Sequence, residues 1–317
     1  MKIPNLKTTA FKSIALFVLF LLVNSQQLFA QQDAQYTQYM YNTVSVNPGY
    51  AGSRGQLSIA ALHRSQWVGL DGAPTTQTLN LHSPIGYRGV GLGLSVVNDK
   101  IGPTSETYFD IDFSYTIYTS AEGRLSFGLK GTAHLLDVRF SELNQIAPDN
   151  SLEQDIDNRF SPNFGAGVYY HTKKFYAGLS VPRILQTTHF KDGPAPSTAR
   201  EQMNLYFITG YVWDLNPNLK FKPTLLTKVV QGAPLQVDLS ANFMLSEKFI
   251  LGAAYRWDAA FSGMVGFNVS NKFLIGMAYD REITELGSAV FNDGSFEVIL
   301  RYDFITTKGG LKSPRFF

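Results

Sequence analysis

Apolar and polar side chains alternate along much of the chain, and the alternation is clearest from Tyr108 to Ile117. One set of positions in this stretch is wholly apolar or aromatic, whereas the other set carries Asp110 and Asp112. Successive side chains of a strand point to opposite faces, so a strand places both carboxylates on one side, while a helix would scatter them. The pattern therefore predicts a strand with one apolar and one polar face.

The same alternation recurs along the chain and predicts about fourteen strands, an even number as in antiparallel bacterial membrane barrels. The predicted strands are 56–67, 75–83, 89–98, 106–118, 123–137, 162–171, 174–182, 202–213, 219–230, 234–244, 248–257, 261–269, 272–281 and 294–305.

The connections between these strands alternate in length. Every second connection is a short turn, and the long connections 138–161, 183–201 and 282–293 all fall among the others. Outer-membrane barrels have short periplasmic turns and longer outer loops, so we place both termini on the periplasmic side. The predicted fold is all-β: a transmembrane antiparallel up-and-down barrel whose apolar face meets lipid.

The composition fits a chain whose strands have one lipid-facing side and one water-facing side. Aromatic residues make up 14% and charged residues only 16% of the chain, whereas an ordinary soluble domain has about 25% charged residues. The chain has no cysteine, so an exported form would gain no stability from disulfides. Its formal net charge of +2 argues against a nucleic-acid binder, which would be strongly basic.

The first thirty residues have the features of a secretory signal peptide. Three lysines precede the apolar run 14–23, which is too short to span a bilayer, and Ala30 supplies a small residue for cleavage. We therefore expect a signal peptide at 1–30, an N-terminal segment at 31–54, the barrel at 55–305 and a C-terminal tail at 306–317. A retained helical anchor is the alternative at the start.

The segment 31–54 is rich in tyrosine and shows no regular alternation. It is predicted either to pack under or inside the barrel or to form a periplasmic contact surface. Packing under or inside the barrel is favoured, because chain termini usually carry little function.

No motif in the sequence points to catalysis, a cofactor or a metal. None of the five histidines stands in an H-E-x-x-H motif, and Gly89–Gly93 lies within an alternating segment without the lysine or helix of a nucleotide loop. The acidic stretch Asp149–Asp157 lacks the glycine turn and closing glutamate of an EF-hand, so a solvated loop is favoured over a calcium site. We predict that the protein is not an enzyme.

Charged residues gather instead on the predicted inward faces: Asp110, Asp112, Lys222, Lys228, Asp238, Arg256, Glu297 and Arg301. Such groups need partners or water. They fit either a network that braces the barrel wall or a polar channel or binding surface, and bracing is favoured.

An ordered set of short motifs resembles the PorP/SprF family of Bacteroidota outer-membrane proteins. The motifs are Gln32–Asn42 (QDAQYTQYMYN), Asn47–Gly52 (NPGYAG), His63–Gly69 (HRSQWVG), Gly72–Pro74, Asn98–Gly102 (NDKIG), Phe127–Gly128, Tyr279–Asp280 and Ser313–Phe317 (SPRFF). Together they cover essentially all of the chain after the signal peptide.

The resemblance implies a barrel that supports type IX secretion, in some organisms linked to gliding motility. It implies three kinds of partner besides outer-membrane lipid: periplasmic secretion components, a peptidoglycan-binding protein, and the C-terminal sorting domain of a secreted adhesin. It carries over no catalytic residue. A passive porin or hydrophobic-solute channel is the main alternative, and a barrel hydrolase is the third.

The sequence yields ten candidates for a structural or partner-binding role. They are Arg64, Gln66, Trp67, Asp99, Asp110, Asp112, Arg256, Asp280, Glu297 and Arg301.

Overall fold

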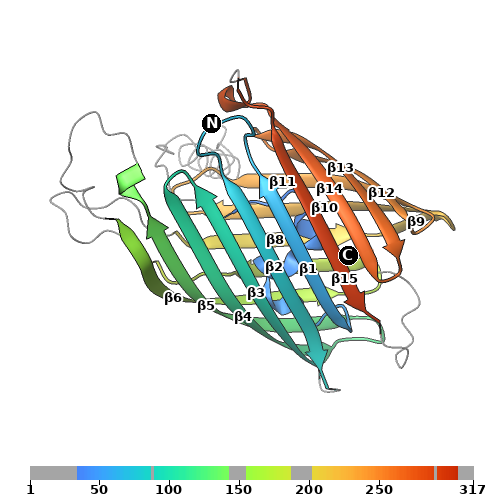
Figure 1. Ribbon diagram of the computed structural model, residues 1–317. Helices are drawn as coiled ribbons and strands as arrows, with labels where there is room; N and C mark the ends of the chain where they lie inside the picture. The colour runs from blue at the N-terminus through green and yellow to red at the C-terminus, as the bar shows by residue number, and fades with distance from the viewer. Residues whose placement is uncertain (1–33, 87–88, 143–154, 187–201, 289–290, 306–317) are drawn as a thin grey trace, which may run out of the picture.

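Figure 1 shows the computed structural model, which describes residues 34–86, 89–142, 155–186, 202–288 and 291–305. Its strands form one antiparallel sheet. The strands are β1 (Leu57–Ser65), β2 (Thr75–Ile85), β3 (Val90–Ile101), β4 (Thr104–Tyr118), β5 (Arg124–Val138), β6 (Ile156–His171), β7 (Phe175–Val181), β8 (Asn204–Tyr211), β9 (Trp213–Asn216), β10 (Leu219–Val230), β11 (Gln236–Leu245), β12 (Phe249–Arg256), β13 (Ala260–Ser270), β14 (Phe273–Glu282) and β15 (Ser295–Phe304).

The sheet closes into a barrel of fourteen strands. β1 pairs with β15, and β10 pairs with β11, so each strand has hydrogen-bonded neighbours around the ring. β8 and the short β9 both pair with β10 and are separated by Val212 alone, so they count as one strand. The predicted fold class is confirmed.

The two ends of the barrel differ, and we name them for their connections. At the turn end, β2–β3, β4–β5, β6–β7, β9–β10, β11–β12 and β13–β14 are joined by short turns. At the loop end lie the connections after β1, β5, β7 and β14. Two short 3-10 helices, η3 (Phe140–Glu142) and η5 (Glu285–Ser288), belong to the loop end.

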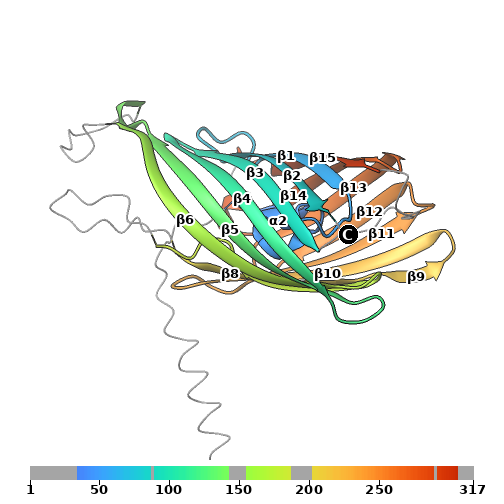
Figure 2. The same cartoon turned by 90° about the horizontal axis from the view of Figure 1, so that it is seen from below.

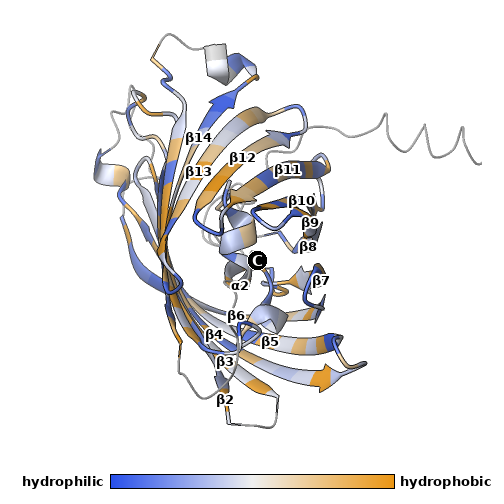
Figure 3. Ribbon diagram, turned by 90° about the vertical axis from the view of Figure 1, so that its right-hand side faces the viewer, coloured by the Kyte–Doolittle hydropathy of each residue, from blue (hydrophilic) through white to orange (hydrophobic). Residues whose placement is uncertain are grey.

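Alternating burial explains why these segments form a barrel wall. Along β4, Tyr108, Asp110 and Asp112 are buried in the lumen, whereas Phe109 and Ile111 are exposed on the outside. Polar side chains therefore line the lumen, and apolar side chains cover the outer surface, as a lipid environment requires. Figure 3 shows the alternation of hydrophilic and hydrophobic residues along the strands.

One boundary prediction was wrong. β6 begins at Ile156 rather than at 162, so the connection after β5 is shorter than the predicted loop 138–161. Arg159 pairs with Leu136 and Phe160 with Leu135 on β5, which gives this polar stretch the partners that hold it in the sheet. Residues 143–154 of this connection lie outside the described part of the chain.

A charge on the outer face should destabilise the barrel. Ile111 lies at the middle of β4 and is 62% exposed on the outer surface. Ile111→Arg should lower the free energy of unfolding by about 2–4 kcal/mol, the cost of arginine at mid-depth in a bilayer. Ile117→Arg, on the same outer face but at the turn end of the strand, should cost no more than about 1 kcal/mol. Denaturant titration in lipid vesicles measures both, and equal losses would contradict a lipid-facing wall at Ile111.

The described part of the N-terminal segment, residues 34–54, lies inside the barrel (Figures 2 and 3). It contains η1 (Tyr39–Tyr41), α2 (Thr43–Val46) and η2 (Pro48–Tyr50). Nearly all of its side chains are buried, including Tyr39 and Met40. Residues 1–33, which include the predicted signal peptide, and the tail 306–317 lie outside the described residues. In the described ranges, no helix has the length and apolar character needed to cross a bilayer.

Candidate functional site in the barrel lumen

The N-terminal segment crosses the lumen from the loop end to the turn end. Tyr36 meets Thr78, and Gln35 meets Gln236, both near the loop end of their strands. Arg54 instead meets Asp303, next to the last residue of β15 at the turn end. The first described residues therefore lie at the end opposite to the one predicted for the N-terminus, because the segment runs through the barrel before β1 begins.

At the loop end a cluster that we call the loop-end latch fastens the segment. Arg64 of β1 bonds to Asp280 of β14 at 2.6 Å and to Glu297 of β15 at 3.2 Å, and all three side chains are buried. The backbone amides of Thr37 and Gln38 each donate to the Glu297 carboxylate at 2.8 Å. The Thr37 hydroxyl donates to Asp280 at 2.6 Å and accepts from Arg64 at 2.9 Å. Three strands and the segment thus share one ion-pair network.

At the turn end a second ion pair, the turn-end latch, holds the segment where it leaves the lumen. The Arg54 guanidinium donates through Nε at 3.1 Å and through Nη2 at 2.7 Å to the two carboxylate oxygens of Asp303. This two-point geometry fixes orientation as well as distance. Arg301 lies 3.7 Å from the same carboxylate, so β15 supplies charged groups to both latches.

Other buried charges brace the wall itself. Lys130 of β5 lies 3.1 Å from Asp110 and 3.3 Å from Asp112 of the neighbouring β4. Arg256 of β12 donates to Asp238 of β11 at 2.6 Å. These pairs join adjacent strands and so stabilise strand pairing. Asp238 also reaches the segment, because its backbone carbonyl accepts from the Tyr39 hydroxyl at 3.4 Å.

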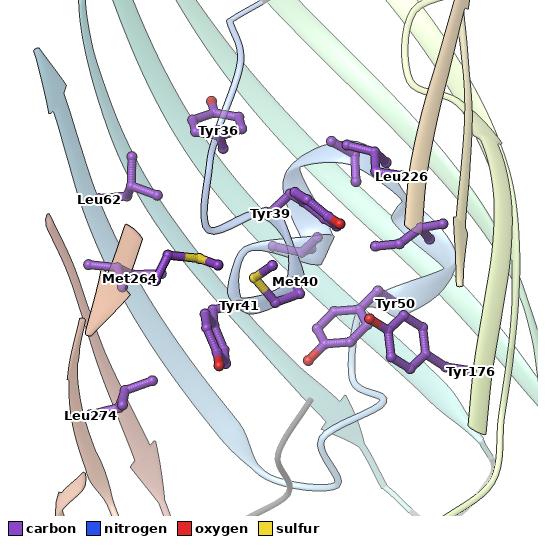
Figure 4. Packing of buried hydrophobic residues seen from close by; sticks show 14 of the residues in the cluster. Tyr36, Tyr39, Met40, Tyr41, Tyr50, Leu62, Tyr176, Leu226, Met264 and Leu274 are labelled. Atoms are coloured by element: carbon purple, nitrogen blue, oxygen red, sulfur yellow. The ribbon is translucent and has the colours of Figure 1, made fainter. Parts of the chain in front are cut away.

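Between the two latches the segment packs through aromatic and apolar side chains (Figure 4). Tyr39 and Met40 belong to one buried cluster with side chains from strands around the barrel. Tyr50 meets Tyr169 of β6 edge-on at 5.2 Å. The Tyr39 hydroxyl bonds to the hydroxyl of Thr224 at 2.8 Å, so the polar atom of this buried ring is satisfied.

The tightest contact joins the turn Asn47–Gly49 to two glycines of the wall. Gly128 of β5 and Gly167 of β6 are register partners. A Cβ on Gly128 would lie 2.1 Å from the Gly49 nitrogen, and a Cβ on Gly167 would lie 2.4 Å from the Asn47 side chain. Only glycine allows this approach.

Six of the ten residues proposed from the sequence point into the lumen in described ion pairs: Arg64, Asp280 and Glu297 in the loop-end latch, Asp110 and Asp112 with Lys130, and Arg256 with Asp238. Arg301 joins the turn-end latch.

The other three candidates lie near the loop end. Trp67 has a left-handed backbone, with φ of 47°, and its indole donates to Glu282 while its amide donates to Ser295 at 3.2 Å. The Gln66 amide donates to the Pro74 carbonyl at 2.9 Å. Asp99 accepts from Thr76 at 2.6 Å. They shape the loop-end rim rather than joining the latches.

Several site residues were missed from the sequence. Lys130 lies on the inward face of the predicted strand 123–137. Sorting the residues of that strand into its two faces would have identified it. Asp303 shares the inward face of its predicted strand with Glu297 and Arg301, but it was not singled out. Arg54, Thr37 and Gln38 carry no local signal, because each acts on a partner about 250 residues away.

The described part of the acidic stretch forms ion pairs. Arg139 lies 3.7 Å from Asp155 and 2.9 Å from Asp157. Hydrogen bonds from the backbone and hydroxyl of Ser141 hold the pKa of Asp155 below its usual value. Among the described residues, no three His, Asp or Glu side chains gather as metal ligands would. Residues 149–154 of the stretch lie outside the described ranges.

Comparison with solved structures finds membrane barrels of low identity. Omp33 of Acinetobacter baumannii has a TM-score of 0.48 at 8% identity, with 78% of this chain and 98% of that chain covered. The Ralstonia pickettii toluene transporter TbuX has 0.48 at 9% identity, with 81% and 91% covered. The monoaromatic hydrocarbon channel CymD has 0.48 at 9% identity, with 87% and 94% covered.

A search of curated proteins finds no match to this chain. The sequence model of one family, described as "Type IX secretion system membrane protein PorP/SprF", matches residues 28–302. The match spans the segment in the lumen and nearly the whole barrel wall. The chain therefore belongs to the PorP/SprF family of type IX secretion system membrane proteins.

Proposed function

We propose that this protein is an outer-membrane barrel that docks type IX secretion components or anchors a secreted adhesin through its C-terminal sorting domain. One observation carries the proposal: the lumen is occupied by the chain's own segment, which is fastened at both ends. A barrel filled in this way serves as a rigid anchor, and its rims are left for partners.

The latches support an anchor more than a solute channel. Arg64 and its two carboxylates are buried, with 2% or less of each side chain exposed. Breaking such a pair leaves an uncompensated buried charge, which is strongly unfavourable. The segment therefore leaves the lumen only at high cost, whereas a porin needs a lumen open to its solute.

The proposal includes an orientation and a route. The signal peptide 1–30 directs export and is removed, the turn end faces the periplasm, and the loop end faces outward. Periplasmic secretion components or a peptidoglycan-binding protein then meet the turn end, and an adhesin domain meets the loop end. Family membership supports partners within the secretion machinery, and their identity is part of the proposal.

Co-purification tests the docking role. The tagged protein is extracted from its native membranes in mild detergent, and associated proteins are identified by mass spectrometry. Stoichiometric recovery of type IX components or of one large adhesin is the expected result and shows which partner applies. A solitary barrel under conditions that preserve other envelope complexes would refute the docking role.

Conductance separates the anchor from the porin alternative. The purified barrel in a planar bilayer should show no steady ion conductance, because the lumen segment occupies the path. A general porin reconstituted in the same bilayer is the control. Stable open-channel steps from the unmodified protein would refute an anchor with a filled lumen and support the porin.

A further inference from the structure

A cavity of about 300 Å³ opens at the turn end, beside the point where the segment leaves the lumen. Its walls come from 51–55 of the segment, from the β2–β3 turn and from the ends of β4, β5 and β6. No residue of either latch is among its lining residues.

Three neighbouring strands place a row of side chains across this cavity. Tyr118 is the register partner of Arg124, and Arg124 is the register partner of His171. The Arg124 guanidinium lies over the Tyr118 ring, 5.4 Å from its centroid. All three residues line the cavity. The Tyr118 ring and the pairing of the three strands fix the position of the Arg124 guanidinium at the cavity. The group is therefore preorganised for a ligand.

The charge of the cavity is complementary to a peptide with acidic side chains. None of its described lining residues is acidic, and Glu122 of the adjacent turn is paired with Lys173 at 2.7 Å. Five of the lining residues are glycines. At Gly89 and Gly91 the space of a Cβ is taken by the chain's own backbone, whereas a Cβ on Gly86 would meet nothing within 4 Å. Gly86 therefore leaves room for another backbone to approach closely. Thr116 adds a hydroxyl at the wall.

We propose that this cavity binds an extended, acidic peptide segment of a periplasmic partner, with one carboxylate received by Arg124. The arginine fork supplies two parallel hydrogen bonds to that carboxylate. The open space at Gly86 accommodates the peptide backbone. The periplasmic source of the peptide rests on the proposed function, whereas the acidic-peptide chemistry rests on the cavity alone.

Peptide binding tests the cavity directly. The full mature protein in lipid nanodiscs is titrated against a fluorescein-labelled peptide, GSEGDG, and against its amide counterpart, GSQGNG, with fluorescence anisotropy as the readout. The acidic peptide should bind about tenfold more tightly, as expected for a charge-assisted hydrogen bond. Arg124→Gln should abolish that difference.

Two further variants serve as a control for Arg124→Gln and as a substitute for it. Lys272→Gln removes an exposed cation from the β13–β14 turn, at the same end of the barrel but outside the cavity, and should leave binding unchanged. If Arg124→Gln fails to insert, Tyr118→Ala replaces it, since it removes the ring under the guanidinium and should weaken the acidic peptide severalfold. Equal losses in Lys272→Gln and Arg124→Gln, or no preference for the acidic peptide, would overturn the proposal. Full displacement by equimolar inorganic phosphate would also overturn it, in favour of a small-anion site.

The same variant distinguishes this inference from the docking role. If wild type recovers a partner from native membranes and Arg124→Gln recovers it equally, the docking role stands and the cavity proposal fails. If wild type recovers no partner but binds the acidic peptide through Arg124, the cavity proposal stands and the docking role fails.

Discussion

Replacing Arg64 with methionine should lower the free energy of unfolding by about 3–5 kcal/mol, because it leaves two buried carboxylates without their cation. Asp280 and Glu297 lie 2.6 and 3.2 Å from the guanidinium and are almost wholly buried. The backbone amides of Thr37 and Gln38 would still donate to Glu297. Two like charges would nevertheless face each other in a medium that screens them weakly.

Arg139 provides a matched control for Arg64. It also lies beside two carboxylates, Asp155 and Asp157, but its side chain is 48% exposed. Arg139→Met should therefore change stability by no more than about 1 kcal/mol, as for other exposed ion pairs. Denaturant titration of both variants in lipid vesicles gives the comparison. Similar small losses in the two would show that the loop-end latch does not hold the segment.

A triple variant separates charge from packing at the latch. Arg64→Met combined with Asp280→Asn and Glu297→Gln removes the cation and both negative charges while preserving most of the volume. It should recover much of the stability lost in Arg64→Met, since replacing a whole buried ion-pair network is far less harmful than breaking it. A triple variant as unstable as Arg64→Met would place the loss in packing instead.

The barrel wall could be predicted from the sequence because its signal is local. The alternation from Tyr108 to Ile117 depends only on neighbours in the chain. The observed strand β4 includes this whole stretch, and its Asp110 and Asp112 face inward. The same reasoning placed Glu297 and Asp280 on inward faces. The start of β6 was missed because Asp157 and Asn158 interrupt the alternation there.

The lumen contacts could not be predicted because closure of the barrel creates them. Arg64 meets Asp280 and Glu297 only once β1 has paired with β15, the last strand of the chain. Thr37 acts through its backbone amide and hydroxyl, and no spacing in the sequence marks those groups. The tyrosine-rich segment lacks a periodic pattern because it meets the wall on all sides, through short helices and turns rather than one face.

Gly128→Val should displace the turn 47–49 from the wall and lower the free energy of unfolding by about 3 kcal/mol or more, the upper range for overpacking. The first added carbon alone would lie 2.1 Å from the Gly49 nitrogen and 2.3 Å from the Pro48 carbonyl carbon. Both are backbone atoms, so no side-chain rotation relieves the clash. The altered turn should also become accessible to an added protease, whereas the wild-type turn is buried.

Gly131 on the same strand is the control for Gly128. A Cβ there meets nothing within 4 Å, so Gly131→Val adds the same side chain to β5 without a clash. It should be neutral or slightly stabilising, because valine favours strands over glycine. The two variants are compared by unfolding in lipid vesicles and by cleavage of the segment under limited proteolysis. If both lose equal stability, or if Gly128→Val leaves the segment protected, the close seating of the segment against β5 is wrong. If only Gly128→Val exposes the segment, Gly128 and its partner Gly167 are the site where the wall makes room for the segment in the lumen.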